Sequence, residues 1–198
     1  MGQMQGLEPP DSHYLNAAVG WLALGCRADA QAELDRISPA HQRNPDVLEV
    51  RWEILAKEKQ WEAALDVARK LLSDAPERAS AWLHHAYALR RAPDGGLEKA
   101  WEALKPAAEK YPREPIIFYN LSCYACQMRK LDEARVWFRR ALKVGGKKEL
   151  KGMALQPFSA SAFEPVSAGA RIRRQSAGSP AGRCPSGSPG AVGACSPS

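Results

Sequence analysis

The stretch FYNLSCYACQMRKLDEARVWFRRAL, residues 118–142, decides the fold of this 198-residue chain. Its apolar residues recur three and four positions apart, a spacing that gathers them on one side of an α-helix. The small residue Ala134 stands where a second helix can approach the first closely. The stretch therefore predicts two helices joined by a tight turn. No segment of the chain alternates with period two for long enough to predict a strand.

The same pattern occurs four times along the chain. Units that start at Asp11, Pro45, Ala79 and Pro115 lie 34, 34 and 36 residues apart. The fourth residue of each unit is bulky and apolar: Tyr14, Leu48, Trp82 and Phe118. The two extra residues of the third unit fall in a turn sequence, Pro93-Asp94-Gly95-Gly96, so both helices of that unit stay in phase.

The second half of each unit repeats as regularly as the first. Each has one small residue at the same position: Ala30, Ala64, Ala100 and Ala134. Four residues later come Leu34, Ala68, Leu104 and Phe138. A fixed period of this length is typical of repeat proteins, in which each unit buries its apolar face against its neighbours.

Four in-phase copies over about residues 11–145 resemble the tetratricopeptide repeat family, most closely in residues 118–142 and 60–68. The resemblance implies an all-α fold, a right-handed solenoid of about four helix-turn-helix repeats. Five positions depart from the family pattern. Arg51 and His85 stand where the family usually has Leu, Trp52 replaces a small residue, Arg27 occupies a site that is commonly aromatic, and no Pro closes the first unit at Gln42.

Composition divides the chain into three segments. We expect residues 1–10 to be disordered, residues 11–155 to form the repeats with a capping helix over about 147–155, and residues 156–198 to be a disordered tail. The tail is rich in Ser, Ala, Gly and Pro, and its four Arg against one Glu supply half of the net charge of +6. The repeats are therefore close to neutral. The abrupt change after Leu155 leaves two interpretations of the tail, a functional segment or an out-of-frame extension.

The resemblance implies that the first helices of successive units line a groove that binds a peptide or helix of a partner protein. The residues expected to face it are Glu49, Glu53, His84, Tyr87, Arg90, Arg91, Tyr119, Asn120 and Gln127. Aromatic and Arg side chains make good interface anchors, so we expect a bound segment that carries a carboxylate. The alternative is that Arg90 and Arg91 are a solvated helix end and that Tyr119 merely packs.

No constellation of residues predicts catalysis, a metal or a cofactor. The pair Cys123 and Cys126 lacks the second pair that a structural zinc site needs, and it lies inside a predicted helix. His84 and His85 are adjacent and point about 100° apart on a helix, so they cannot easily share a ligand. We expect one to be exposed and the other partly buried. The sequence thus predicts a non-enzymatic interaction protein.

Two other functions remain open, a scaffold or chaperone-like subunit of a larger complex and weak binding of RNA or an anionic surface by the basic tail. The tail lacks the aromatic residues that stack on bases, so nucleic acid is not the expected ligand. The N-terminus lacks a secretory signal pattern and no stretch is apolar enough to span a membrane. Five Cys at irregular spacing favour reduced thiols, and we expect a cytoplasmic protein.

Overall fold

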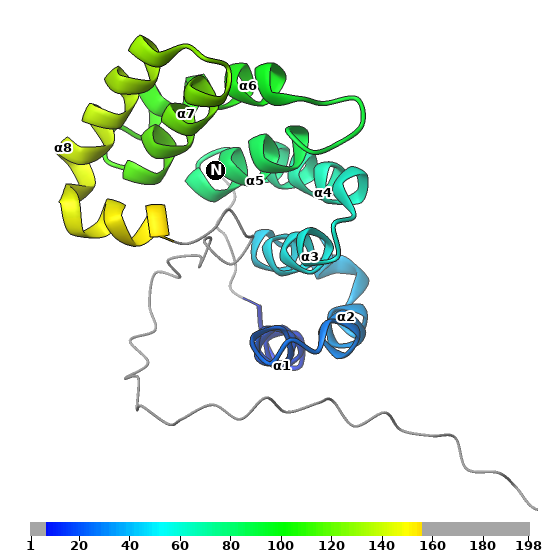
Figure 1. Ribbon diagram of the computed structural model, residues 1–198. Helices are drawn as coiled ribbons and strands as arrows, with labels where there is room; N and C mark the ends of the chain where they lie inside the picture. Colours follow the sequence, from blue (N-terminus) through cyan, green and yellow to red (C-terminus); the bar gives the residue numbers. More distant parts are fainter. Residues whose placement is uncertain (1–6, 156–198) are drawn as a thin grey trace, which may run out of the picture. The chain divides into compact units, whose positions relative to one another are not determined.

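The computed structural model describes residues 7–155, which form eight α-helices and one 3-10 helix and contain no strand (Figure 1). The bounds are α1 Asp11–Ala23, α2 Arg27–Asp35, η1 Pro39–His41, α3 Pro45–Lys57, α4 Trp61–Asp74, α5 Ala79–Leu89, α6 Leu97–Lys110, α7 Pro115–Gln127 and α8 Leu131–Leu155. The expectations for residues 1–6 and 156–198 lie outside the described part of the chain.

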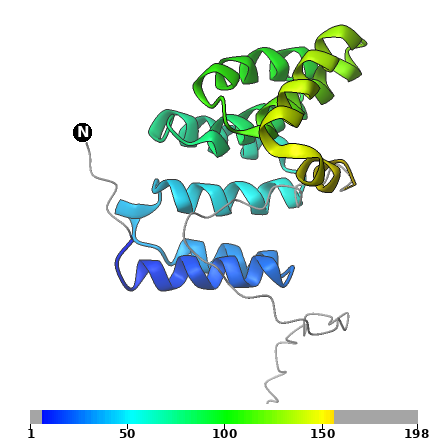
Figure 2. The same cartoon turned by 90° about the vertical axis from the view of Figure 1, so that its left-hand side faces the viewer.

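The helices pack in the order of the sequence. Each one contacts its neighbour along the chain, and α3 also contacts α1 and α5. The first helices α1, α3, α5 and α7 begin at Asp11, Pro45, Ala79 and Pro115, the residues that open the four units of the sequence register. Figure 2 shows the helix pairs as successive layers. The prediction of an all-α helical repeat solenoid is confirmed.

Residues that favour helix starts define the beginnings of two of these first helices. The side chain of Asn44 accepts a hydrogen bond from the backbone N–H of Asp46 at 2.9 Å and so caps α3. Pro45 and Pro115 occupy the first position of α3 and α7, where the missing N–H of proline costs no helix bond.

The turn within a unit needs one residue in the left-handed backbone region. Gly25, Lys59 and Arg129 stand at the same register position of units one, two and four, with φ of 83°, 60° and 61°. A side chain is disfavoured in that region, so units two and four hold a strained residue where unit one has glycine.

The third unit makes its turn differently because of its two extra residues. α5 ends at Leu89 and α6 begins at Leu97, so the insertion lengthens the loop. A Cβ atom on Gly95 would lie 1.6 Å from the carbonyl oxygen of Leu89, and only glycine permits this approach. Ala100 and Leu104 are fully buried, so α6 keeps the phase of the repeat.

The core consists of the same positions in successive units. Ala30, Ala64 and Ala100 are 0% exposed, and so are Leu34, Ala68 and Leu104 four residues later. Phe138 holds the equivalent place in α8 and is 41% exposed. The second helices of the first three units are covered by a following unit, whereas α8 has no complete unit after it in the described chain.

α8 contains a break that the helix bounds conceal. Gly146 has φ 74° and ψ 166°, which is not helical, so the element consists of residues 131–145 and a shorter segment 147–155. Leu150 in the shorter segment is 2% exposed and belongs to the apolar cluster that contains Ile117, Phe118 and Leu121 of α7. The segment is therefore held to the repeats by at least this one side chain.

Gln42 and Arg51, two of the residues that depart from the repeat pattern, form a hydrogen bond with each other. The Gln42 amide donates hydrogen bonds to the carbonyl oxygens of Leu34 at 3.0 Å and Ile37 at 2.6 Å, which closes the end of α2. Its oxygen accepts a hydrogen bond from the Arg51 guanidinium at 2.6 Å. Gln42 thus closes the first unit at a position where the family pattern has Pro, and Arg51 gives that amide its remaining partner.

Candidate functional site

The residues predicted to bind a partner lie on α3, α5 and α7 and at the start of the loop that follows α5. We call the set that keeps some exposure the first-helix face: Glu49, Glu53, Tyr87, Arg90, Arg91, Tyr119, Asn120 and Gln127. Its members differ in how much of their polar chemistry the protein itself already uses.

Arg91 is the most distinctive member of the face. Its guanidinium lies 3.5 Å from the centroid of the Tyr87 ring and 5.1 Å from that of Trp61, and it donates a hydrogen bond to the Tyr87 carbonyl oxygen at 3.1 Å. It forms no ion pair with a carboxylate of residues 7–146. Half-burial lowers the pKa of Arg91. The charge is held in place between two rings, with nothing negative against it among the described residues.

Arg90 joins two units of the face. Its guanidinium donates a hydrogen bond to the Gln127 side-chain oxygen at 2.7 Å, a contact between residues 37 apart in the sequence. It also lies 5.6 Å from the centroid of the Tyr124 ring. Burial raises the pKa of Tyr124 to about 12. Arg90 and Gln127, two of the predicted residues, are therefore brought together from the third and fourth units.

Tyr119 and Asn120 make their polar contacts within α7. Tyr119 shares a side-chain hydrogen bond with Cys123 one turn on, and burial first, then Cys123, raises the pKa of Tyr119 to about 12. Asn120 donates a hydrogen bond to the carbonyl oxygen of Ile116 at 2.9 Å. Both residues remain partly exposed, and Tyr119 stays neutral across the physiological range.

The two acidic members of the face are paired with cations. Glu49 accepts a hydrogen bond from the Ser80 hydroxyl at 2.5 Å and lies 3.3 Å from the Arg78 guanidinium. Glu53 forms an ion pair with Lys57 one turn on at 3.2 Å. These pairs neutralise much of the negative charge that Glu49 and Glu53 bring to the middle of the face. The α5 end of the face therefore dominates its electrostatics.

His84 does not belong to the exposed set. It is 4% exposed, and its ring stacks on that of Trp52 with 3.9 Å between centroids and 13° between planes. Burial lowers the pKa of His84 to about 3. The large Trp52 fills the space between α3 and α5, so a residue expected to face the groove lies in the core. Its neighbour His85 is half-buried. One histidine is therefore partly buried, as expected, but the other is fully buried where an exposed one was expected.

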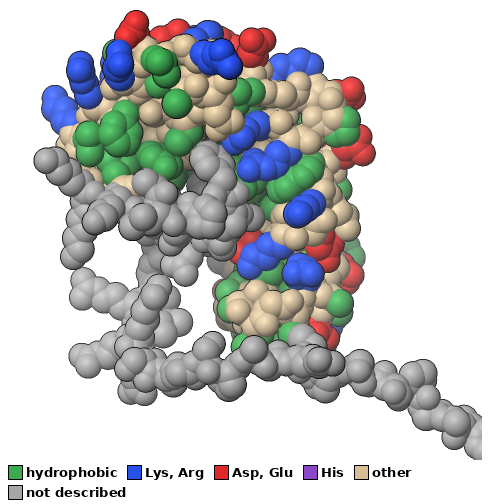
Figure 3. All heavy atoms as spheres, in the orientation of Figure 1, with side chains coloured by type: hydrophobic (Ala, Val, Ile, Leu, Met, Phe, Trp, Pro, Cys, Tyr) green, Lys and Arg blue, Asp and Glu red, His purple; other side chains and the backbone are tan. Residues whose placement is uncertain are grey.

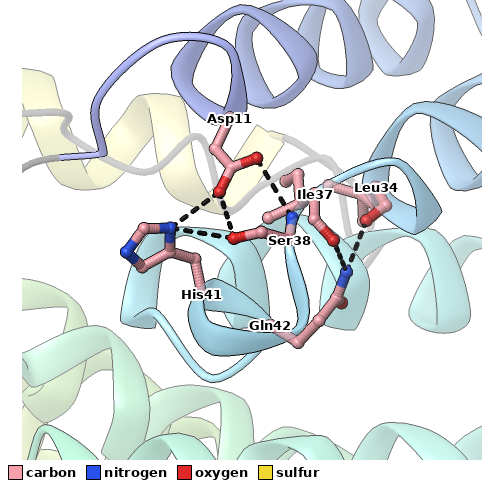
Figure 4. Close-up of polar contacts among 6 residues, drawn as sticks. All are labelled: Asp11, Leu34, Ile37, Ser38, His41 and Gln42. Carbon is pink, nitrogen blue, oxygen red and sulfur yellow. Dashed lines mark hydrogen bonds and ion pairs between the residues drawn. The ribbon is translucent and has the colours of Figure 1, made fainter.

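A Ser, His and Asp cluster that the sequence patterns did not indicate lies in the first unit (Figure 4). Asp11 accepts hydrogen bonds from the Ser38 backbone N–H at 3.0 Å and from the Ser38 hydroxyl at 2.5 Å. The Nδ1 atom of His41 lies 2.7 Å from Asp11 Oδ2 and 3.1 Å from the Ser38 hydroxyl. The one sequence feature that could have indicated this cluster is the pair Ser38-Pro39, because it is typical of a helix start.

This arrangement differs from that of a nucleophilic triad. In a triad the serine and the carboxylate face different nitrogens of the imidazole. Here both face Nδ1 of His41, and the serine hydroxyl donates to Asp11. Asp11 instead accepts the N–H of Ser38, the residue just before η1, and so ties the start of α1 to the chain that follows α2.

The described residues hold no group of three or more His, Cys, Asp or Glu side chains that could bind a metal ion. Cys123 and Cys126 lie one turn apart on α7 as free thiols, Cys123 partly buried and Cys126 exposed. Over residues 7–155, no helix has the length and apolar character needed to cross a membrane.

Solved structures with the same fold place the chain in a structural class. The thermophilic tetratricopeptide repeat protein TTC0263 of Thermus thermophilus matches with a TM-score of 0.62 and 20% identity over 72% of this chain and 78% of that one. A crystal structure of MamA matches with a TM-score of 0.61 and 16% identity over 70% and 80%. The MamA RS-1 ArsTM double mutant matches with 0.59 and 20% over 70% and 76%.

The sequence comparisons add no relative. No protein-family model matches the chain. No curated protein matches it either. At identities of 16% to 20% the structural matches define the fold, and the chain has the tetratricopeptide repeat fold.

Proposed function

We propose that the chain is a non-enzymatic interaction protein that binds a peptide or helix of a partner protein on its first-helix face. The observation that carries the proposal is the position of Arg91. Its guanidinium is half-buried and stacked on Tyr87, with no carboxylate of the described residues beside it. A partly desolvated cation in a fixed position gains more from an incoming carboxylate than a solvated one does.

The neighbours of Arg91 support the same proposal. Arg90 is oriented by Gln127, and Tyr119 offers a neutral, half-buried ring on the next helix. Orienting an Arg before binding reduces the side-chain entropy lost when the partner arrives. The ligand we propose is therefore a segment with at least one carboxylate placed near α5 and an apolar residue near α7.

The test is affinity purification from the native host with the full chain as bait, followed by mass spectrometry. We expect partners captured by the wild type to be lost with Arg90→Ala/Arg91→Ala/Tyr119→Ala. The matched control is Lys70→Ala/Arg113→Ala, two exposed cations that form no ion pair among residues 7–146. Circular dichroism verifies that each variant is folded. Unchanged capture by the folded Arg90→Ala/Arg91→Ala/Tyr119→Ala variant would rule out this face as the binding surface.

A further inference from the structure

One face of α8 stays exposed at positions that are buried in the second helices of the other units. Residues at the position of Phe138 in the first three units, Leu34, Ala68 and Leu104, are 0% exposed, whereas Phe138 is 41% exposed. Leu131, which lies two turns earlier on the same side of the helix, is 53% exposed. In the earlier units a helix of the following unit covers this side.

Cations surround these apolar residues. Arg135 lies between Leu131 and Phe138 on the same stripe, and Arg139 follows Phe138. The equivalents of Arg135 in units two and three are Leu65 and Trp101, each 5% exposed. We call Leu131, Arg135, Phe138, Arg139 and the half-buried Leu142 the α8 end face. Figure 3 shows hydrophobic side chains gathered over α8 with Lys and Arg along the same edge.

The charge of the end face is one-sided. The acidic residues of α8 before Gly146 are Asp132 and Glu133 in its first turn, and the four charged residues that follow are Arg135, Arg139, Arg140 and Lys143. Asp132 pairs with Arg135 at 3.0 Å, but both side chains are exposed, so water screens the pair. A polar face would suffice to end a repeat stack, and it would not need an exposed Phe and Leu.

We propose that the α8 end face binds an acidic amphipathic helix of a partner protein, which lies where the next unit of the stack would lie. The register supplies the form of the partner, because helices cover this position in every earlier unit. Charge complementarity supplies its chemistry, an apolar stripe for Phe138 and Leu131 flanked by Glu or Asp for the arginines. The chain's own residues 156–198 fit poorly, since they carry four Arg and one Glu.

The probe is a designed helical peptide with a Leu stripe flanked by Glu, compared with the same peptide carrying Lys in place of Glu. Fluorescence anisotropy with the full chain measures both affinities. We expect the Glu peptide to bind at least about tenfold more tightly than the Lys peptide. Arg135→Glu/Arg139→Glu reverses the preference, and the control Lys70→Glu/Arg113→Glu, with cations exposed on other elements, preserves it.

The position of the bound peptide is tested by photocross-linking from Phe138→p-benzoylphenylalanine in the full chain. The expected product joins residue 138 to the Glu peptide. Equal affinity for the two peptides overturns the proposal, and so does a preference that Arg135→Glu/Arg139→Glu leaves unchanged. Cross-links from position 138 to residues 156–198 of the same chain, or to a second copy of it, also overturn the proposal, because they identify a different occupant of the face.

Discussion

The imidazole of His84 stacks on the indole of Trp52 across the contact between α3 and α5, with 3.9 Å between the ring centroids. Trp52 is 2% exposed and His84 4%, and Tyr87 meets the same indole edge-on at 5.8 Å. The buried stack therefore joins units two and three directly beneath Arg91, which lies over the Tyr87 ring. The first-helix face is built on this stack.

The stack predicts that acid destabilises the protein through His84. The unfolded chain binds the imidazole proton near the ordinary pKa of 6.5, whereas burial holds the folded pKa of His84 at about 3. Protonation thus favours the unfolded state, and the free energy of unfolding falls as the pH decreases from 6.5 toward 3 by up to about 1.4 kcal/mol per pH unit.

His84→Phe keeps an aromatic ring against Trp52 and removes the titration. Urea unfolding at about pH 7 and about pH 5 gives the measurement, and we expect a smaller loss of stability in the variant than in the wild type. The exposed His13→Gln is the control for removing a histidine. Equal losses in wild type and His84→Phe would falsify the assignment of this pH dependence to His84.

A second prediction concerns the contact between Gln42 and Arg51. Gln42→Ala removes the two hydrogen bonds to the carbonyl oxygens of Leu34 and Ile37 and should lower the free energy of unfolding by about 1–2 kcal/mol. In a double-mutant cycle with Arg51→Met, the double variant should lose less than the sum of the single losses, by about 0.5–1 kcal/mol. Strict additivity in urea unfolding would mean that these two departures from the repeat pattern are energetically independent.

A third prediction follows from the left-handed turns. Lys59→Gly relieves a positive φ at 60° and should stabilise the protein, by about 0.5–1 kcal/mol after the entropy cost of glycine. Gly25→Ala should cost about 1 kcal/mol, from backbone strain alone because no atom lies within 4 Å of the added Cβ. Lys70→Gly, inside α4, is the control and should destabilise. A loss of stability in Lys59→Gly would contradict the strain argument.

A fourth prediction concerns Asp11 in acid. The hydrogen bond from the Ser38 side chain, followed by that from His41, lowers the pKa of Asp11 below 3.8. The carboxylate therefore contributes its stability above that value and loses it as the pH falls through the folded pKa. Thermal melts from about pH 5 to about pH 2 give the measurement. The wild type should have a higher melting temperature than Asp11→Asn at about pH 5, and the two melting temperatures should converge in acid. A constant difference across the range, with the surface variant Asp29→Asn as reference, would argue against a role for this ionisation.

The sequence by itself determined the repeat architecture, because the evidence for it is periodic and local. Four in-phase copies set the starts of α1, α3, α5 and α7, and the turn sequence at residues 93–96 placed the insertion in a loop. Ala30, Ala64 and Ala100 are fully buried because their fixed spacing puts each on the apolar face of its helix. The same register also grouped Gln127, the last residue of α7, with Arg90 and Arg91, which directly follow α5.

Only the tertiary structure decided what those residues do to one another, because such contacts depend on side-chain size and on partners from other units. Trp52 in place of a small residue draws His84 into the core, and no periodic pattern records that choice. Arg78 and Lys57 neutralise acids that the register presents as groove charges. Asp11 meets Ser38 and His41 across about thirty residues, and the exposure of Phe138 depends on whether another unit follows it. Local spacing determines which face a side chain occupies, and the neighbouring units determine whether that face is covered, charged or free to bind.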